Sequence, residues 1–189
     1  MQLILPIPAN DMSKRNFIMD TISYKWCTSS DSYLLDTLAD LFVENAGAQY
    51  ISHGEVIDGR ANNMNEWKTN IKTIIKEEFA EAMHIVPDSF KTFSRITIAQ
   101  QNGYTVALAL VEFRPETKVA ILCDIVVSAQ LRSQKIGESM LCWIEAEAKQ
   151  WGANFIFLES GNTNQSAHHF FKRMGFHATS VVMMKEIYR

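Results

Sequence analysis

A short polar segment between a strand-like run and a helix-like run is the part of the sequence best suited to chemistry. The stretch is VVSAQLRSQKIGESML, residues 126–141, with one glycine at Gly137. A strand, a tight loop and a helix N-terminus in this order leave several backbone N–H groups without an internal acceptor. Such groups bind anions, because the helix dipole adds positive potential around them. The sequence therefore predicts a phosphate-carrying ligand at this loop.

A second candidate for chemistry is Glu159, near the end of the apolar run NFIFLES at residues 154–160. Open α/β sheets bind their ligands at the carboxyl ends of parallel strands. A carboxylate there could contact a cationic amine, together with Glu44, Glu55 and Glu112 in one acidic pocket. The alternative is that these scattered carboxylates belong to the ordinary solvated surface.

The elements that must position these residues form a mixed α/β pattern. Apolar residues at helical spacing predict helices at 31–47, from Trp67 to before Pro87, at 137–150 and at 164–174. Alternating or wholly apolar runs predict strands at 94–100, 105–113, 118–127, 154–160 and 179–187. The turns QNGY and RPET join the first three strands into an antiparallel meander, and strands that follow a helical crossover run parallel.

The chain of 189 residues is long enough for one domain with an ordinary hydrophobic core. We expect a single domain over residues 23–189 and an N-terminal extension over residues 1–22. The run LILPI in that extension could be an edge strand, a docked arm or a contact with a second copy. Residues 47–63 are rich in glycine and lack periodicity, which predicts a surface loop that could act as a lid.

Composition excludes several classes of partner. A net charge of -3 argues against a surface that coats nucleic acid. Cys27, Cys123 and Cys142 lie far apart in apolar surroundings, which predicts reduced, buried thiols and no metal site. The N-terminal run lacks a basic leader, and no window reaches the roughly 20 apolar residues of a membrane span. We therefore expect a cytoplasmic protein without nucleic-acid or membrane partners.

At this point the C-terminal half resembles the GNAT superfamily of N-acetyltransferases, which use acetyl-CoA. Their phosphate-binding pattern is Gln or Arg, two residues, Gly, one residue, then Gly or Ala. Arg132 and Gly137 match its ends, and Lys135 stands in place of the first glycine. A second motif, NQSAHHFFKRMGF at residues 164–176, matches in register with its Asn, its Ala, an aromatic pair and a closing Gly-Phe. The resemblance covers roughly Phe93 to Ile187 and implies the GNAT fold, a central mixed sheet of about six to seven strands flanked by about four helices.

The resemblance implies acetyl-CoA as the co-substrate, with no metal, and the family's sites carry over to matching positions. The pyrophosphate would lie among the N–H groups of the loop, and the pantetheine arm would add itself like a strand beside the strand before it. The implied cofactor-binding residues are Ile125, Val126, Val127, Arg132, Ser133, Gln134, Lys135, Ile136, Gly137, Glu138, Asn164 and Phe171. A lysine at position 135 costs free energy if the family's geometry needs a positive φ there.

Two positions depart from the family's usual catalytic residues. The Glu that acts as base in many relatives aligns with Cys123, and the Tyr that acts as acid aligns with Phe171. Asp124 is the nearest carboxylate, but strand alternation points it away from the face of Cys123, and a purely structural role explains it equally well. We expect Asp124 or Glu159 to carry the catalysis.

The departing thiolate needs no acid if it leaves unassisted, since a thiol pKa is about 8.5. Water, Ser160 or Tyr104 could also supply the proton. The predicted reaction is direct acetyl transfer in a ternary complex to the primary amine of a small molecule or peptide. One alternative is a coenzyme A binding or sensing module with little turnover. Another is an acyltransferase for longer chains.

The sequence leaves the oligomeric state open. Pairing of terminal strands would give a homodimer contact.

Overall fold

The computed structural model describes residues 22–28, 31–85, 87 and 90–187. The chain divides into two compact units. The first, here called the sheet unit, comprises Met1–Gly47 and Thr69–Glu159, and the second, the loop unit, comprises Ala48–Lys68 and Ser160–Arg189. The expected N-terminal extension lies outside the described residues except for Ile22, and a single domain over residues 23–189 stays a prediction.

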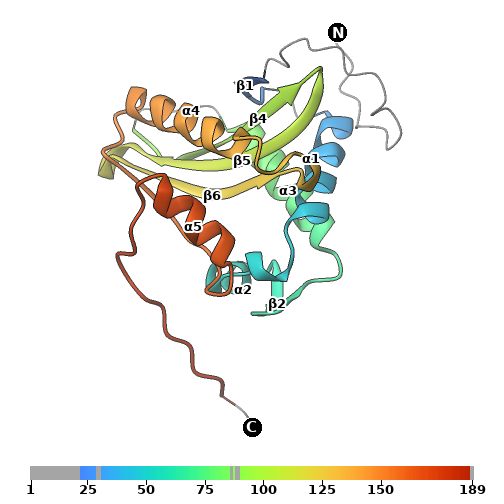
Figure 1. The fold of residues 1–189 in the computed structure, drawn as a ribbon, viewed down its shortest axis with the longest axis vertical. Helices are drawn as coiled ribbons and strands as arrows, with labels where there is room; N and C mark the ends of the chain where they lie inside the picture. Colours follow the sequence, from blue (N-terminus) through green and yellow to red (C-terminus); the bar gives the residue numbers. More distant parts are fainter. Residues whose placement is uncertain (1–21, 29–30, 86, 88–89, 188–189) are drawn as a thin grey trace. The chain divides into compact units, whose positions relative to one another are not determined.

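A five-stranded mixed sheet forms the centre of the sheet unit (Figure 1). Its strand order is β1-β4-β5-β6-β7, antiparallel from β1 to β6 and parallel between β6 and β7. The bounds are β1 Ile22–Trp26, β4 Phe93–Gln101, β5 Tyr104–Arg114, β6 Val119–Val127 and β7 Phe155–Leu158. The predicted mixed fold is confirmed, including both hairpin turns, and β1 is a strand that the sequence pattern did not predict.

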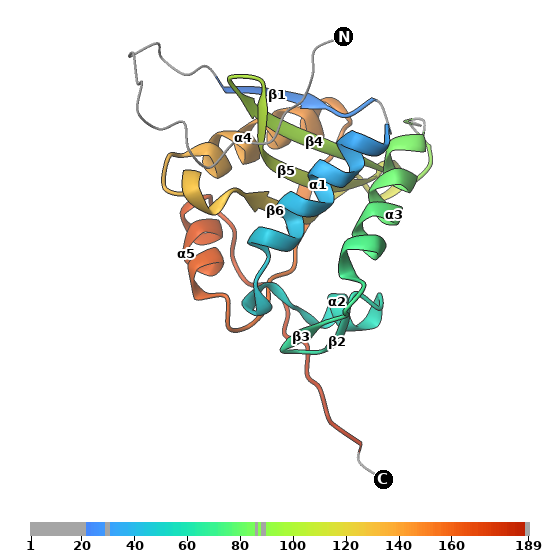
Figure 2. The same ribbon diagram turned by 90° about the vertical axis from the view of Figure 1, so that its right-hand side faces the viewer.

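Helices cover both faces of this sheet. Helix α4 (Ile136–Gln150) lies on one face, and α1 (Ser32–Asn45) and α3 (Ile71–His84) lie on the other (Figures 1 and 2). The side chain of Asp31 caps α1 by accepting a hydrogen bond from the N–H of Leu34 at 2.8 Å. The periodicity therefore predicted these helices correctly, although α3 begins at Ile71 rather than at Trp67.

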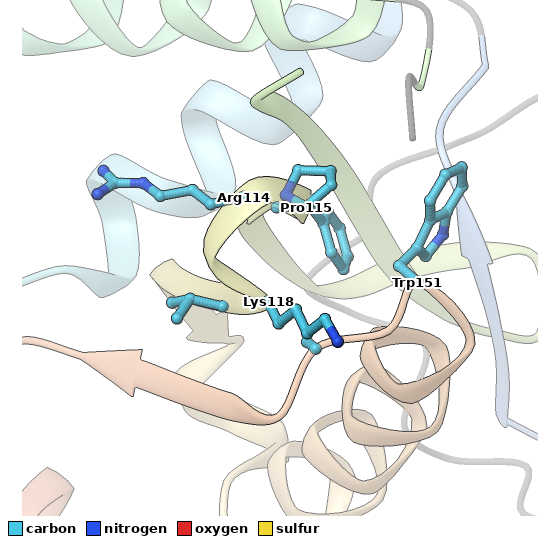
Figure 3. A pocket seen from close by; sticks show the side chains of 7 residues that line it. Arg114, Pro115, Lys118 and Trp151 are labelled. Atoms are coloured by element: carbon cyan, nitrogen blue, oxygen red, sulfur yellow. The ribbon is translucent and has the colours of Figure 1, made fainter. Parts of the chain in front are cut away.

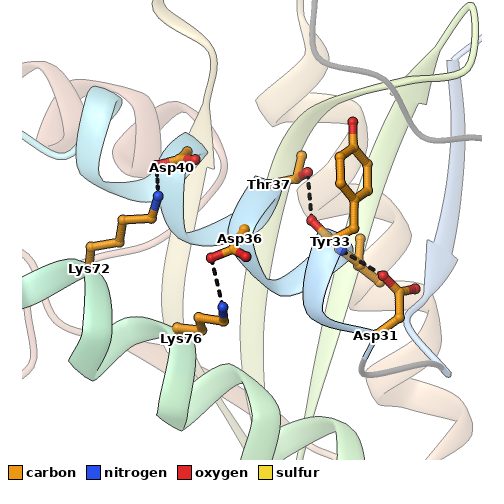
Figure 4. A network of polar contacts seen from close by, with 8 residues as sticks. Asp31, Tyr33, Asp36, Thr37, Asp40, Lys72 and Lys76 are labelled. Carbon is orange, nitrogen blue, oxygen red and sulfur yellow. Dashed lines mark hydrogen bonds and ion pairs between the residues drawn. The ribbon is translucent and has the colours of Figure 1, made fainter.

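Two ion pairs join α1 to α3 on their solvent side (Figure 4). Lys76 Nζ lies 2.7 Å from Asp36 Oδ1, and Lys72 Nζ lies 2.6 Å from Asp40 Oδ1. The hydrogen bond from Lys76 lowers the pKa of Asp36, and the hydrogen bond to Asp40 raises the pKa of Lys72. Pairs this exposed contribute little to stability, so the packing of α1 against α3 rests on their apolar faces.

An aromatic cluster fixes β1 against the rest of the sheet unit. The ring of Trp26 packs 4.9 Å from Trp143 of α4 and 5.8 Å from Phe113 of β5. Its Nε1–H donates to Glu147 at 2.7 Å, and the guanidinium of Arg95 lies 4.6 Å above the ring. Contacts of this kind stabilise a strand of only five residues, ISYKW, in which apolar and polar residues alternate.

The three cysteines differ in their surroundings, and all three are free thiols. Burial raises the pKa of Cys27 to about 12. Cys123 and Cys142 are exposed, so the prediction that all three are buried is wrong for these two. Cys123 is exposed because β7 stops pairing with β6 at the preceding residue.

We expect two fast thiols and one slow thiol when the folded protein reacts with iodoacetamide at pH 8. Cys123 and Cys142 are accessible, whereas Cys27 stays protonated with a pKa of about 12. Mass spectrometry of the alkylated peptides over time measures this directly. A Cys27 that reacts as fast as the other two would contradict its burial, and the unfolded protein in guanidinium serves as the control in which all three react.

The loop unit contains the segment expected to be a surface loop. In place of a loop without structure, it holds α2 (His53–Ile57) and a small two-stranded sheet of β2 (Ala61–Asn63) and β3 (Glu66–Trp67). Helix α5 (Gln165–Arg173), which the sequence predicted at 164–174, also belongs to this unit.

The predicted strand at 179–187 is wrong for the described residues. Residues 174–187 contain no helix or strand, so the central sheet has five strands instead of the expected six to seven. Val181 and Met183 are 86% and 91% exposed, and the neighbouring apolar side chains are exposed as well. An apolar run becomes a strand only when it pairs with another strand, and no such pairing forms here.

Candidate functional site

The loop between β6 and α4 has an unusual backbone. Ser133 and Lys135 both have a positive φ, of 64° and 62°, and Lys135 is the N-cap residue of α4. A residue with a side chain pays about 1–2 kcal/mol for this left-handed conformation. The structure therefore answers the question raised by Lys135: the backbone there needs a positive φ, and a lysine adopts it.

This conformation directs a set of N–H groups outward. The first bond of the α4 ladder runs from Ser139 N to Lys135 O. Within the described parts of the chain, no acceptor takes the backbone N–H groups of residues 133–138. Successive N–H groups around left-handed residues, at the positive end of a helix dipole, form a concave anion site. The geometry suits a pyrophosphate held by the backbone rather than by side chains.

The side chain of Arg132 turns back from this loop toward the body of the sheet unit. Its Nη2 donates to the carbonyl oxygen of Asn45 at 2.9 Å, and its Nε donates to the carbonyl oxygen of Val127 at 3.4 Å. Gln134 and Lys135 are exposed. Arg132 therefore joins the loop to the ends of α1 and β6, a contact that no sequence motif indicated.

Strand β6 opens away from β7 at the level of Cys123. The parallel pairing ends at Leu122 and Leu158. On the other side, a bulge at Cys123 shifts the register, because Leu110 pairs with Asp124 and Val111 pairs with Leu122. Among the described residues, the pairing of β6 with β7 does not extend over residues 123–127. A strand-like ligand could add itself along this edge of β6, which includes Ile125 and Val127.

The two candidate catalytic carboxylates lie in different environments. Asp124 is 1% exposed and shares the buried face of β6 with Leu122 and Val126. Glu159 is exposed and follows Leu158 directly, one step beyond the last residue pair of the two strands. By alternation along each strand, Glu159 and the exposed Cys123 point to the same face of the sheet, one residue beyond the last registered pair. Asp124 points to the opposite, buried face.

The residues of the second motif are held within the loop unit. Asn164 Oδ1 accepts from the N–H of Ala167 at 3.3 Å, so Asn164 caps α5. Phe171 is buried, with ring centroids 5.1 Å from Phe170 and 5.7 Å from Phe176. These contacts explain why the motif carries an Asn and aromatic residues, and contact of Asn164 and Phe171 with the coenzyme stays a prediction.

The predicted acidic pocket loses two of its members. Glu55 is buried in the loop unit and forms an ion pair with the buried Arg60, with Nη1 and Oε2 3.3 Å apart. Glu112 accepts a hydrogen bond from Arg114 Nε at 2.5 Å. Of the four carboxylates, Glu44 and Glu159 are exposed residues of the sheet unit, and a joint acidic pocket stays a prediction.

Gly161 packs against backbone in the loop unit. A Cβ at this position would lie 2.4 Å from the carbonyl oxygen of Ile51 and 2.6 Å from that of Gln49. The hydroxyl of the adjacent Ser160 is buried, and no group among the described residues hydrogen-bonds to it. The segment 48–51 and the segment after β7 therefore meet with no room for a side chain.

We expect Gly161→Ala to destabilise the loop unit by about 2–3 kcal/mol, because overpacking against backbone cannot be relieved by a side-chain rotation. Thermal unfolding followed by circular dichroism measures the loss. Gly103→Ala is a matched control: Gly103 has a φ of +82° but no atom near its Cβ position, so only about 1 kcal/mol of backbone strain is expected. Equal losses for the two variants would contradict the steric explanation.

A shallow surface hollow lies at the far end of β6 (Figure 3). Its lining residues are Phe113, Arg114, Pro115, Lys118, Val119, Trp151 and Ala153. Strand β6 runs from Val119 to Val127, so this hollow is roughly 26 Å from the phosphate loop at 3.3 Å per residue. It is therefore separate from the candidate site.

In the described parts of the chain, no helix is long and apolar enough to span a membrane. The described part of the chain also holds no group of three His, Cys, Asp or Glu side chains placed to bind a metal ion.

The chain is similar to known acetyltransferases. The model of the acetyltransferase (GNAT) family matches residues 62–176. Aminoalkylphosphonate N-acetyltransferase from Salmonella typhimurium (strain LT2) is 40% identical over 53 residues, which are 28% of this chain and 34% of that enzyme. The match thus spans about a third of that relative.

Solved structures share the fold at low sequence identity. An aminoglycoside N-acetyltransferase in complex with CoA has a TM-score of 0.58 and 11% identity, with 89% of this chain and 95% of that chain covered. An aminoglycoside acetyltransferase from an uncultured soil metagenomic sample, in complex with sisomicin, has a TM-score of 0.59 and 12% identity over 89% and 97% of the two chains. The family match covers more than half of the chain, and the protein therefore belongs to the GNAT family of N-acetyltransferases, which use acetyl-CoA.

Proposed function

We propose that the protein transfers an acetyl group from acetyl-CoA to the primary amine of a small molecule or peptide, directly and in a ternary complex. The observation that carries this proposal is the pairing of two features on one strand. The loop after β6 presents the N–H groups of residues 133–138, and the pairing of β6 with β7 stops before residues 123–127. The first suits a pyrophosphate and the second suits a pantetheine arm.

The residues divide the reaction between them. With pantetheine beside Ile125 and Val127, the thioester lies near Cys123 and Glu159. Glu159 accepts a proton from the acceptor ammonium, directly or through water, and the neutral amine attacks the thioester carbon. The nitrogen of the tetrahedral intermediate loses a proton to water, the carbonyl re-forms as the C–S bond breaks, and the sulfur leaves as a thiolate. Because Phe171 cannot donate a proton, the thiolate leaves unassisted or is protonated by water, Ser160 or Tyr104.

The acceptor is proposed to be a small amine. Relatives of the chain support a small amine, since they include an aminoalkylphosphonate N-acetyltransferase and aminoglycoside acetyltransferases. Glu159, exposed at the carboxyl end of β7, supplies the negative charge that a cationic amine requires. A peptide amine remains within the same chemistry and is distinguished by a substrate panel.

Isothermal titration with acetyl-CoA and with coenzyme A tests the first half of this proposal. Micromolar binding followed by thiol release with a panel of primary amines, among them aminoalkylphosphonates and aminoglycosides, would support it. Binding without turnover on any amine would favour a coenzyme A sensing module, for which Phe171 and Cys123 are the motivation. A preference for longer acyl chains would favour the other alternative. A folded protein that binds neither ligand would exclude all three.

We also propose a homodimer formed through the exposed apolar segment at positions 181–187. The apolar side chains at positions 181–184 and 187 are exposed in a single chain, and burying them in a second copy would remove them from water. Light scattering after size-exclusion chromatography measures the mass, and Met183→Lys should shift a dimer to monomer. A monomer at all concentrations would contradict the homodimer.

The three free cysteines fit a reducing compartment, and we propose that the protein is located in the cytoplasm.

A further inference from the structure

The end of α1 and the phosphate loop are joined by side-chain contacts that belong to no family motif. Asn45, the last residue of α1, accepts a hydrogen bond through Oδ1 from the backbone N–H of Ala129 at 2.6 Å. In the opposite direction, Arg132 Nη2 donates to the backbone carbonyl of Asn45 at 2.9 Å. These two bonds cross between the same two segments, and we call them the α1 latch.

Both halves of the Asn45 amide are used, which fixes the orientation of the side chain. Its Nδ2 donates to the carbonyl oxygen of Leu41, one turn earlier in α1, at 2.8 Å. Its Oδ1 is then directed at Ala129. Only a side chain with an acceptor and a donor at this length makes both contacts.

Arg132 complements the same helix end. The last carbonyls of a helix lack internal partners and carry the negative end of the dipole, so a guanidinium is favourable there. Its Nε also donates to the carbonyl oxygen of Val127, the last residue of β6, at 3.4 Å. One side chain thus holds together the end of α1, the end of β6 and the start of the loop. Its remaining N–H donors stay open to solvent.

The loop needs such support because its backbone is strained. Beyond the latch, the segment from Ser128 is fixed by the bond from its own N–H to Val106 O at 2.9 Å and by one turn, Leu131 N to Ser128 O. The left-handed residues Ser133 and Lys135 follow immediately. Strained conformations persist only where the surrounding contacts over-determine them.

We propose that Asn45 is a positioning residue for coenzyme binding, which acts through Ala129 and Arg132 to hold the N–H groups of residues 133–138 in place. This inference rests on the proposed function of the loop. According to this proposal, α1 affects the affinity for coenzyme A without contacting the coenzyme.

The first test uses the protein without any ligand. The N–H of Ala129 is on an exposed residue, and the Asn45 side chain is its acceptor, so its amide hydrogen exchange reports on the latch. Asn45→Ala should raise the exchange rate of this amide about tenfold, whereas Asn45→Asp, which keeps an acceptor oxygen but loses the donor to Leu41, should raise it by less. Val43→Ala, an exposed site on the same helix, is the matched control and should change nothing. Equal exchange rates of the Ala129 amide in Asn45→Ala and in the wild type would show that the α1 latch does not hold the loop.

The second test measures coenzyme A affinity by titration and then KM and kcat for acetyl-CoA. Asn45→Ala should raise Kd about tenfold and KM in parallel, with kcat changed by less than about threefold and with the melting temperature retained. The salt dependence of binding should stay that of the wild type, because no phosphate contact is lost. Asn45→Ala with unchanged Kd overturns the inference while the proposed function stands. A wild type that binds no coenzyme A, with the exchange result intact, overturns the proposed function instead.

Discussion

Gly137→Asp is expected to abolish coenzyme A binding while the protein stays folded. Position 137 lies in the first turn of α4, among the N–H groups of residues 133–138 that have no acceptor in the described chain. An aspartate there offers those groups an internal carboxylate and repels the two charges of a pyrophosphate. The loss should exceed about 100-fold in Kd, which corresponds to about 2.7 kcal/mol. Isothermal titration at about 0.15 M salt measures it.

Gly137→Asn is the matched control, because it has the shape of the aspartate without its charge. If the negative charge is the main effect, Gly137→Asn should retain measurably more affinity than Gly137→Asp. Melting temperatures within a few degrees of the wild type show that both variants fold, as a carboxylate in the first turn of a helix is favourable for the helix itself. Wild-type affinity in Gly137→Asp would remove the phosphate-loop model.

Glu159→Gln is expected to lower kcat by about 10²–10⁴-fold, the range typical for loss of a general base. The KM for acetyl-CoA should change little, because the phosphate loop and β6 are untouched. Glu159 directly follows the last pair of the two strands, Leu122 and Leu158, and it points to the same exposed face as Cys123. Steady-state kinetics with a responsive amine measure kcat and KM separately.

Asp124→Asn is the comparison that separates the two carboxylates. Asp124 is buried on the opposite face of β6, so its replacement should reduce the free energy of unfolding more than it affects kcat per folded molecule. If Asp124→Asn removed activity at full stability and Glu159→Gln left kcat unchanged, the assignment of the base would have to be reversed.

Much of the fold could be predicted from the sequence because its elements have strong local patterns. Helix α1 has a cap at Asp31 and a regular apolar face, and β5 is an uninterrupted apolar run between two turns. Strand β1 was missed although its sequence ISYKW alternates apolar and polar residues, because it has only five residues and its partner β4 is distant in sequence. The strand at 179–187 was predicted from its apolar composition, but pairing depends on a partner that composition does not specify.

Some features of the candidate site could likewise be predicted from the sequence, and others could not. The phosphate loop followed from the order of strand, loop and helix, since that order alone determines which N–H groups lack acceptors. The bulge at Cys123 and the alignment of Glu159 with it depend on the register between strands, which the sequence does not state. Asn45 is distant in sequence from Ala129 and its contact is purely tertiary, so no spacing rule could have identified it.

The left-handed backbone at Ser133 and Lys135 makes the shape of the loop dependent on its surroundings. A glycine adopts a positive φ freely, whereas a residue with a side chain loses about 1–2 kcal/mol there. The apparent affinity for a ligand falls with the fraction of molecules whose loop has the competent shape. With a lysine at position 135, that fraction depends on the contacts that hold the loop, so a substitution far from the ligand can weaken binding.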